Sequence, residues 1–241
     1  MKALILNSGL GSRMGDITRT HPKCMTDIPN NETIISRQLR LLADTDIKDV
    51  IIIIGYFNKV LVDYCESLNL PLNYTFVHNP DYSTTNYIYS IYLAKELLED
   101  DDILLIHGDL VFLDSVLKDI IACKDSCVKV SSTLPLPPKD FKAVIKDGYV
   151  KAVGVEFFDS AMEAQALYKI NKDDWKIWMN KMIEFCETDQ KKVYAEKALN
   201  AITDELLLKP FDVEDRLCSE IDNPEDLEVV SAKLIEQENL C

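Results

Sequence analysis

The feature that most constrains this chain is a set of three short, almost wholly apolar runs separated by segments with helical periodicity. The runs are KALIL at 2–6, VIIII at 50–54 and ILLI at 103–106. Runs of this length and character are typical of parallel strands covered by helices on both faces. The expected helices are residues 32–42, 60–68, 86–98 and 115–122, with a further strand at 73–77. The alternation predicts an α/β fold with right-handed crossovers.

Beyond residue 125 the pattern changes to longer strands. Residues 128–133 and 143–155 are predicted strands, and Asp147-Gly148 inside the second run favours a hairpin turn. Two more helices are expected, one capped by Asn171 and one capped by Asn223 with Pro224 at its first position. The apolar face of the first consists of Trp175, Trp178, Met179, Met182 and Ile183. We expect this later part to fold over one end of the sheet.

Charge and cysteine usage exclude several classes of protein. The 241 residues include 26 Lys and Arg against 41 Asp and Glu, a net charge of −15. An acidic surface repels nucleic-acid phosphates and anionic lipids, so neither nucleic acid nor a membrane is expected as a partner. The apolar runs are far shorter than the roughly 20 residues that span a bilayer, and we expect a cytoplasmic protein. The 7 scattered cysteines contain no Cys-x-x-Cys, which argues against a zinc site or a disulfide framework.

The segment that follows the first strand carries three glycines, at positions 9, 11 and 15. Glycine lets backbone N–H groups approach an anion closely. The segment lacks the Gly-Lys-Ser/Thr ending of a Walker A loop, and no acid follows the second strand to hold a ribose. Up to Lys23 the chain has four basic residues and one acid, Asp16, an excess that is unusual in so acidic a chain. We therefore expect a polyphosphate held by backbone amides, Arg13 and Lys23.

Acidic side chains occur where two further strand-like segments end. Asp109 follows Gly108 just beyond ILLI, and Glu220 and Asp222 alternate in a late extended segment, which places them on one face. Ligands bind at the carboxyl edge of a parallel sheet, and Mg²⁺ prefers hard oxygen ligands. These acids are therefore candidates for a Mg²⁺ site, whereas nearby His107 is expected to have a packing role.

The order Gly9-Leu10-Gly11-Ser12-Arg13-Met14, followed by Pro22-Lys23, resembles the N-terminal signature of the nucleotidyltransferases that activate sugars and small phosphates. The resemblance extends over the whole chain and is closest to the bacterial phosphocholine and 2-aminoethylphosphonate cytidylyltransferases. It implies a Rossmann-like three-layer α/β/α nucleotidyltransferase fold, with a mostly parallel central sheet and a small substrate-covering β/α segment. The single domain, residues 1–241, would comprise a nucleotide-binding part (about 1–125), a substrate-binding or lid part (about 126–218), and a metal-binding strand end with the C-terminal helix (219–241).

The resemblance also implies roles for individual residues. Arg13 and Lys23 would neutralise the α-phosphate and the departing pyrophosphate, and Asp109 would share a catalytic Mg²⁺ with Glu220 and Asp222. The implied nucleotide contacts are Asn7, Ser8, Gly9, Gly11, Ser12, Arg13, Lys23, Tyr82, Thr85, Asn86, Ser90 and Gly108. This chain departs from the family pattern at Asn7-Ser8, where the family usually has Ala-Ala or Ala-Gly; both residues are small, so we expect the backbone path of the loop to survive.

The resemblance further implies the class of substrate. Residues 79–90 are similar to the loop and helix that cover the nucleoside in the cytidylyltransferases, and the glycine-containing loop of the hexose-1-phosphate enzymes is absent. Tyr194 and Glu196 resemble the aromatic residue and acid that meet the choline ammonium, and Phe141 lies near the position of another aromatic residue. The implied reaction transfers CMP from CTP, or another NTP, to a small phosphate or phosphonate and releases pyrophosphate.

Two other functions stay open at this stage. One is a sugar-1-phosphate nucleotidylyltransferase, and the other is a nucleotide-binding regulator that has lost turnover. The combination of Lys23, Asp109 and Asp222 argues against a regulator, because sensing does not require all three. A hydride-transferring enzyme is disfavoured by the missing ribose acid. A homodimer is left open.

Overall fold

A computed structural model describes residues 1–239. The last two residues of the expected segment 219–241, which include Cys241, lie outside the described residues. Within this range nine strands form one sheet whose path runs β10-β9-β11-β6-β1-β4-β5, with β8 paired to β11 and β12 paired to β8. The strands are β1 Lys2–Asn7, β4 Asp49–Ile54, β5 Asn73–His78, β6 Ile103–His107, β8 Cys127–Ser131, β9 Lys142–Lys146, β10 Tyr149–Gly154, β11 Ala161–Ile170 and β12 Lys209–Asp212.

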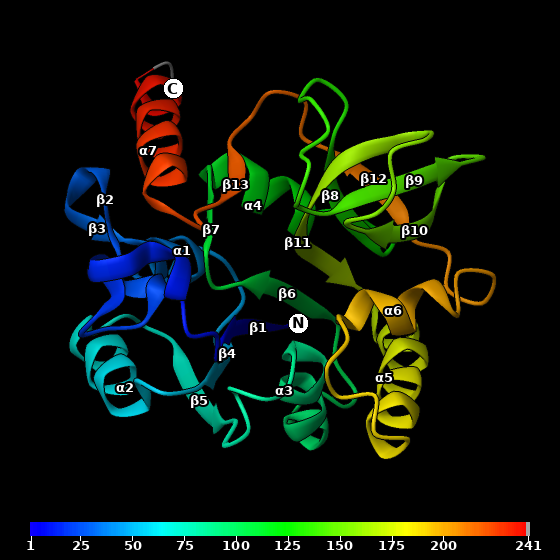
Figure 1. Cartoon of the computed structure of the whole chain (residues 1–241), viewed down its shortest axis with the longest axis horizontal. Helices are drawn as coiled ribbons and strands as arrows, with labels where there is room; N and C mark the ends of the chain where they lie inside the picture. Colours follow the sequence, from blue (N-terminus) through cyan, green and yellow to red (C-terminus); the bar gives the residue numbers. More distant parts are fainter. Residues whose placement is uncertain (240–241) are drawn as a thin grey trace.

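The three apolar runs form the parallel centre of this sheet, as their composition predicts. β1 pairs in parallel with β4 and with β6, and β4 pairs in parallel with β5. β11 then joins β6 in the antiparallel direction, and the β9–β10 hairpin extends the sheet beyond it. In Figure 1, β4 and β5 lie at the lower left and β8 to β10 at the upper right. The α/β fold with a central, mostly parallel sheet is confirmed; beyond β6 the strands pair antiparallel, except that β12 pairs with β8 in parallel.

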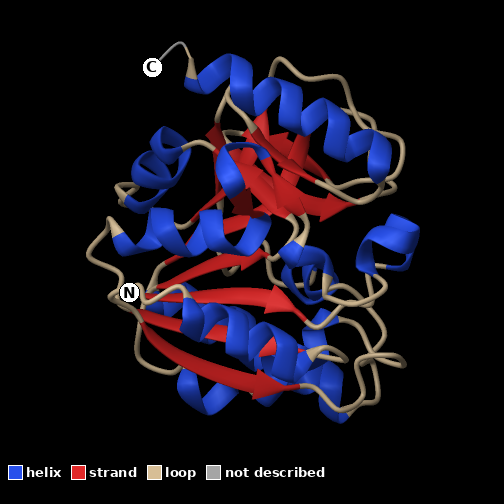
Figure 2. Ribbon diagram, turned by 90° about the vertical axis from the view of Figure 1, so that its left-hand side faces the viewer, coloured by secondary structure: helices blue, strands red, loops and turns tan. Residues whose placement is uncertain are grey.

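Helices cover both faces of the sheet, which explains why β4 has no polar face (Figures 1 and 2). Val50, Ile52 and Ile54 enter one core cluster, whereas Ile51 and Ile53 enter the other. The first cluster contains apolar residues of α1 Ile34–Ala43, α2 Asn58–Ser67, α4 Asp114–Ile121 and α7 Pro224–Glu238. The second contains those of α3 Tyr87–Leu93, α5 Lys172–Glu187 and α6 Ala195–Asn200. Alternate residues of one strand thus fill two cores.

The bounds of the four helices predicted before residue 125 agree with the observed bounds to within two residues, and one of these helices is interrupted. The helix predicted from residue 32 begins at Ile34, because the Thr33 hydroxyl accepts a hydrogen bond from the Ser36 amide at 3.1 Å and caps it. Glu32 and Thr33 instead form β3, which pairs with β2 Asp27–Ile28. The helix predicted over 86–98 is interrupted near Ala94 and continues as a short 3-10 helix, Lys95–Leu97.

Turn and cap residues behave largely as expected. Asp147 and Gly148 have φ values of 54° and 77°, the conformation of a tight hairpin turn, and they join β9 to β10. Asn223 caps α7 by accepting hydrogen bonds from the amides of Glu225 and Asp226. Asn171 occupies the N-cap position of α5, but its side chain bonds Lys169 and the Lys124 carbonyl instead.

Two short strands bring the end of the chain back to the sheet edge. β13 Cys218–Glu220 pairs with β7 Leu110–Phe112, so that Glu220 stands opposite Leu110. The Ile221 amide then donates to the Asp109 carbonyl at 3.1 Å. Three further 3-10 helices are Ser12–Thr18, Lys23–Met25 and Pro29–Asn31. Among residues 1–239, none of the helices combines the length and apolarity needed to cross a lipid bilayer.

Candidate active site

The carboxyl ends of β1 and β6 open into two adjoining cavities of about 360 Å³ and 290 Å³. Their shared lining residues are Leu6, Gly9, Arg13, Lys23, Asp109 and Asp222. The larger cavity also exposes the predicted site residues Ser8, Tyr82, Thr85, Asn86, Phe141, Tyr194 and Glu220. The smaller one exposes Asn7, Gly11, Ser12 and Gly108. The structure therefore gathers all but two of the predicted site residues, Ser90 and Glu196, around one continuous hollow.

The glycine-containing loop is seated against two glycines at the ends of neighbouring strands. A Cβ atom added to Gly55, after β4, would lie 2.4 Å from the Ser8 carbonyl oxygen. A Cβ atom added to Gly108, after β6, would lie 1.6 Å from Oδ1 of Asn7. Because neither contact is sterically allowed, any side chain at these two positions would push the loop away from the sheet. Asn7, which departs from the family pattern, is thus accommodated by Gly108.

Lys23 joins the two acidic segments at the floor of the cavities. Its Nζ atom lies 2.6 Å from Oδ2 of Asp109 and 2.7 Å from Oδ1 of Asp222. Burial lowers the pKa of Lys23, but the two carboxylates outweigh burial and raise this pKa above its ordinary value. Arg13, which is exposed, reaches the other oxygen of Asp222 at 2.7 Å. Two cations from the loop region therefore converge on one carboxylate.

The N-terminus of α7 fixes Asp222 in this position. The Asp222 amide donates to Oδ2 of Asp226 at 2.9 Å, and the same carboxylate accepts from the Asn223 amide at 3.2 Å. This arrangement is part of the capping box of the helix. The Asn-Pro-Glu-Asp sequence that predicts a helix start thereby also orients an acid of the site.

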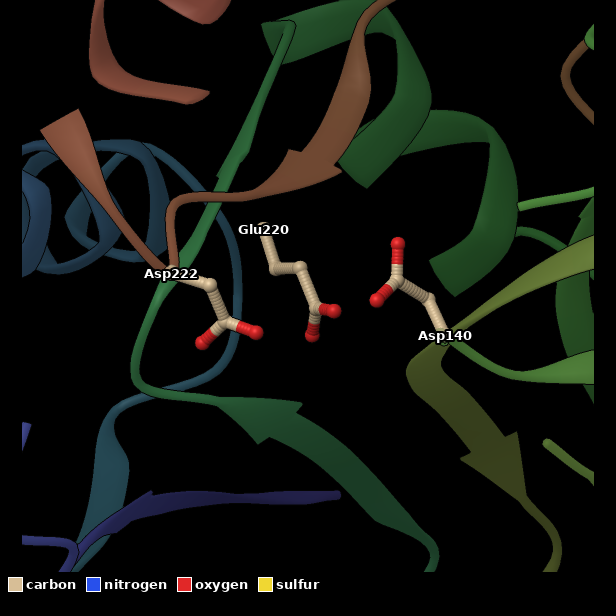
Figure 3. Close-up of side chains that lie close together, drawn as sticks. All are labelled: Asp140, Glu220 and Asp222. Atoms are coloured by element: carbon tan, nitrogen blue, oxygen red, sulfur yellow. The ribbon is translucent and has the colours of Figure 1, made fainter. Parts of the chain in front are cut away.

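Asp140, Glu220 and Asp222 form a compact acidic cluster, with one oxygen of each within 4.8 Å of the others (Figure 3). Burial, together with the charges of Asp109, Asp222 and Asp140, holds the pKa of Glu220 well above its usual range. In addition, the buried Oδ1 atom of Asp109 has no hydrogen-bond partner among residues 1–239. Clustered carboxylates and an unpaired buried oxygen suit a hard divalent cation such as Mg²⁺.

The acidic cluster differs in one member from the predicted set. Glu220 and Asp222 are brought together as expected, whereas Asp109 lies beside the cluster and shares Lys23 with Asp222. Asp140 was not predicted. It lies in the loop between β8 and β9, and no strand-end pattern marks it in the sequence.

Aromatic side chains form one wall of the larger cavity. The Tyr194 ring lies 5.2 Å from the Phe141 ring, edge to face, and 5.8 Å from the Tyr87 ring. The Tyr87 ring in turn meets the His107 ring edge to face at 4.7 Å. Burial lowers the pKa of His107, which favours its neutral form. Tyr87 was not predicted, although it directly follows the predicted Asn86. We call Tyr87, Phe141 and Tyr194 the aromatic wall.

Ser90 and Glu196, the two predicted residues outside the cavity lining, lie beneath the surface. Ser90 is fully buried, and its hydroxyl lies 3.0 Å from both the Ser8 hydroxyl and the Asn79 side-chain nitrogen. It therefore ties the loop after β1 to the loop after β5. Glu196 is 2% exposed and accepts hydrogen bonds from the hydroxyls of Tyr87 and Tyr168. Tyr87, which lines the larger cavity, is bonded to Glu196, and a direct contact of Glu196 with a ligand stays a prediction.

Residues 3–127 match the sequence profile of the MobA-like NTP transferase domain. This segment is more than half of the 241-residue chain. The chain belongs to the MobA-like NTP transferase family.

Three relatives of this NTP transferase are bacterial enzymes whose names refer to CMP or to cytidylyl transfer. The chain is 32% identical over 138 residues to the CMP-5'-(3-aminopropyl)phosphonate synthase of Streptomyces rubellomurinus, a match that covers 57% of this chain and 22% of the relative. It is 39% identical over 98 residues to the choline-phosphate cytidylyltransferase of Streptococcus pneumoniae, covering 41% of each. It is 28% identical over 130 residues to the CTP:phosphoglutamine cytidylyltransferase of Campylobacter jejuni, covering 52% and 50%. The chain thus spans half or less of these relatives.

Solved structures confirm the predicted nucleotidyltransferase fold over almost the whole chain. The CTP:phosphocholine cytidylyltransferase of Streptococcus pneumoniae superposes with a TM-score of 0.79 at 22% identity, covering 97% of this chain and 98% of that one. A UDP-glucose pyrophosphorylase complexed with UDP-glucose gives a TM-score of 0.78 at 16% identity, covering 98% of each. Since enzymes named for two different nucleotides share this fold, the fold does not select the nucleobase.

Proposed function

We propose that this NTP transferase uses Mg²⁺ and transfers CMP from CTP to a small phosphate or phosphonate, with release of pyrophosphate. The observation that carries the proposal is the Lys23 ammonium, which lies within 2.7 Å of both Asp109 and Asp222 at the floor of a cavity that the glycine-containing loop lines. A lysine so placed faces phosphate on one side and its own counterions on the other.

The reaction is an in-line displacement at the α-phosphorus of CTP. An anionic oxygen of the acceptor forms the new P–O bond, and the bond from the α-phosphorus to the oxygen that bridges it to the β-phosphate breaks, so that its electron pair leaves with pyrophosphate. Because the acceptor oxygen is already an anion, no general base is needed. The chain's task is to position the two anions and to offset their charge.

In this proposal, backbone amides and two basic residues offset the negative charge of the phosphates. Backbone amides between Gly9 and Ser12 bind phosphate oxygens, because the glycines leave them accessible. Arg13 is exposed at the mouth of the cavity and can follow the leaving pyrophosphate, whereas Lys23 is held in place by its two carboxylates. The charge that develops on the leaving group is thus met by groups that need no reorganisation.

We assign the metal site to Asp109, Glu220 and Asp222, with Asp140 as an additional member. The acidic cluster and the unpaired oxygen of Asp109 fit a hard cation. When bound, Mg²⁺ would neutralise phosphate charge and help to orient both substrates. The division of labour that we propose broadly follows the sequence: residues 1–125 bind the nucleotide, 126–218 bind the acceptor, and 219–241 supply the metal ligands Glu220 and Asp222, to which the first two parts add Asp109 and Asp140.

The acceptor in this proposal carries a positive charge at the end opposite its phosphate. The aromatic wall offers ring faces to the larger cavity. A cation against ring faces is favourable, by about 1–2 kcal/mol where it is desolvated. The names of the relatives, which include choline phosphate and an aminopropylphosphonate, support the same class of acceptor.

The experiment that tests the proposal is a matrix of substrates with pyrophosphate release as the readout. CTP, UTP, dTTP and GTP are each combined with phosphocholine, 2-aminoethylphosphonate and glucose 1-phosphate in the presence of Mg²⁺. We expect release above background only with CTP and a cationic phosphate or phosphonate. Release with glucose 1-phosphate as the better acceptor would contradict the acceptor class, and no release in any combination would favour a regulator.

One observation favours a sugar-1-phosphate nucleotidylyltransferase as the second candidate. The chain is 29% identical over 181 residues, 72% of its length, to the bifunctional sugar-1-phosphate nucleotidylyltransferase/acetyltransferase of Sulfurisphaera tokodaii. This match extends further along the chain than the three cytidylyltransferase matches given above. The glucose 1-phosphate arm of the matrix separates the two candidates.

A further inference from the structure

A buried carboxyl group lies directly behind the aromatic wall. Glu196, in the first turn of α6, is 2% exposed. Its two oxygens have different partners: Oε2 accepts from the hydroxyl of Tyr87 on α3, and Oε1 accepts from the hydroxyl of Tyr168 on β11 at 2.9 Å. The carboxyl group thus connects three elements that are far apart in the sequence.

Glu196 has hydroxyl partners and no ion pair among the described residues. None of the lysine, arginine or histidine side chains in residues 1–239 lies within salt-bridge distance of it. Burial accordingly raises the pKa of Glu196 to about 8. A buried acid without a counterion is unfavourable as an anion, so it suits hydrogen bonding better than the binding of a cation.

The rings of Tyr87 and Tyr168 differ in their surroundings. Tyr87 lines the larger cavity, and its ring contacts His107 and Tyr194, which continues to Phe141. Tyr168 is fully buried, and its ring packs edge to face on Trp178 at 5.3 Å. The hydrogen bond to Tyr87 therefore holds a residue that lines the cavity, whereas the bond to Tyr168 anchors Glu196 to the sheet.

We propose that Glu196 is a positioning residue: anchored to β11 through Tyr168, it fixes the Tyr87 ring and, through that ring, the aromatic wall that receives the cationic end of the acceptor. This inference rests on the proposed function and assigns no direct contact between Glu196 and substrate. The hydroxyl bond fixes one end of the ring, whereas the other contacts described for the ring are with the side chains of His107 and Tyr194.

The substitution that separates positioning from direct binding is Glu196→Gln. Glutamine keeps the size of the side chain and can serve both hydroxyls, accepting with its oxygen and donating with its nitrogen. It lacks the charge that a directly bound ammonium would require. Positioning therefore predicts that Glu196→Gln retains the acceptor KM within about twofold, whereas Glu196→Ala raises it on the order of tenfold, the effect of one lost hydrogen bond.

Tyr87→Phe and Tyr168→Phe form a matched pair, since each removes one hydroxyl from the same carboxyl group. We expect Tyr87→Phe to raise the acceptor KM about as much as Glu196→Ala, and the double variant Glu196→Ala/Tyr87→Phe to be no worse than either single variant. Tyr168→Phe should change the acceptor KM less than Tyr87→Phe. The KM for CTP should stay within about twofold of wild type in all of them.

Three kinetic outcomes would overturn the inference. Equal acceptor losses in Glu196→Gln and Glu196→Ala would show that the charge itself is needed. Additive losses in the double variant, or a change in the KM for CTP alone, would show that Glu196 does not act through Tyr87.

A measurement without substrates keeps this inference separate from the proposed function. Crystal structures of the wild type, Glu196→Gln and Glu196→Ala should show the Tyr87 ring in place in the first two and displaced in the third. An unmoved ring in Glu196→Ala would refute positioning even if the enzyme transferred CMP. A displaced ring in a protein that transfers nothing would refute only the proposed reaction.

Discussion

Lys23 illustrates how single residues acquire a role through their partners. On its own, a lysine after a proline in a basic segment is unremarkable. In the structure it bridges Asp109, which follows β6, and Asp222, which precedes the N-cap of α7. The ammonium cannot shift without separating two charged pairs, so it is a pre-positioned positive charge.

Substitution of Lys23 should affect turnover more than nucleotide binding. We expect Lys23→Ala to lower kcat on the order of 10²-fold, as for other groups that stabilise developing charge, with a smaller change in the KM for CTP. Steady-state kinetics with CTP and a saturating acceptor measures both. Lys59→Ala, which removes an exposed lysine paired with Asp63 on α2, is the control. A normal kcat with only a raised KM would mean that Lys23 merely binds CTP.

Asp140 provides a test of the metal assignment at the same scale. Asp140→Asn removes one charge from the acidic cluster and should weaken Mg²⁺ binding on the order of tenfold. Isothermal titration with Mn²⁺ measures this without turnover, and activity in excess Mg²⁺ should recover. Asp63→Asn serves as the control, because it removes the charge of an exposed acid on α2, outside the acidic cluster. Unchanged Mn²⁺ affinity in Asp140→Asn would exclude Asp140 from the metal site.

At the scale of elements, the glycine that follows β6 decides how closely the loop after β1 can pack against the sheet. Gly108 leaves room for the Asn7 side chain, whereas at Gly9 an added Cβ would meet none of the described residues within 4 Å. A side chain at position 108 would therefore disturb the packing of the loop against the sheet, whereas a side chain at position 9 would point into open space. The two glycines make a matched pair for measurement.

Gly108→Ala should destabilise the protein, because the new Cβ collides with Asn7. Forced overpacking of this kind costs about 1–3 kcal/mol. Urea unfolding should show this loss for Gly108→Ala and a change below about 0.5 kcal/mol for Gly9→Ala. Equal stability of the two variants would mean that the loop is not seated against β6.

Local sequence patterns predict the elements well and the long-range contacts poorly. The apolar runs specify β1, β4 and β6 because both faces of these strands are buried. The break near Ala94 is missed because the apolar spacing continues across it. Asp140 and Tyr87 are missed for a different reason: their role depends on which segments meet at the cavity, and no local spacing encodes that.

At the scale of the whole molecule, the site is assembled where the two halves of the sheet meet. The parallel half supplies the glycine-containing loop and Asp109, and the part of the chain that forms the later half supplies Asp140 and the aromatic wall residues Phe141 and Tyr194. Glu220 comes from β13, which pairs with β7 outside this sheet. Glu196 joins these halves through Tyr87 and Tyr168. Because Glu196 is buried at this junction, its ionisation should also affect the free energy of unfolding.

The free energy of unfolding should depend on pH through Glu196. Burial raises the pKa of Glu196 from 4.5 to about 8. Between these values the unfolded chain releases the proton and the folded chain keeps it, so stability falls as pH rises, on the order of 1 kcal/mol per unit. Below about pH 4.5 the contribution is complete, and above about pH 8 it is lost. Thermal unfolding of wild type and Glu196→Gln from pH 5 to 8.5 measures this.

Because glutamine does not titrate, the stability of Glu196→Gln relative to wild type should increase from pH 5 to about pH 8 and then level off. Lys129 and Glu163 form a buried ion pair elsewhere on the sheet and are unchanged in both proteins, so their contribution cancels. Parallel stability curves for the two proteins would mean that Glu196 is already ionised at low pH in the folded chain.

The central claim is that the chain joins CMP to a cationic phosphate or phosphonate, and ³¹P NMR of the reaction tests it most directly. With CTP, Mg²⁺ and phosphocholine or 2-aminoethylphosphonate, the account predicts a new diphosphate or phosphono-phosphate anhydride signal and an equal amount of pyrophosphate. Asp109→Asn and Asp222→Asn should each form both products on the order of 10²-fold more slowly. CTP left intact by the wild-type protein with every cationic acceptor, or near wild-type rates in both variants, would contradict the account.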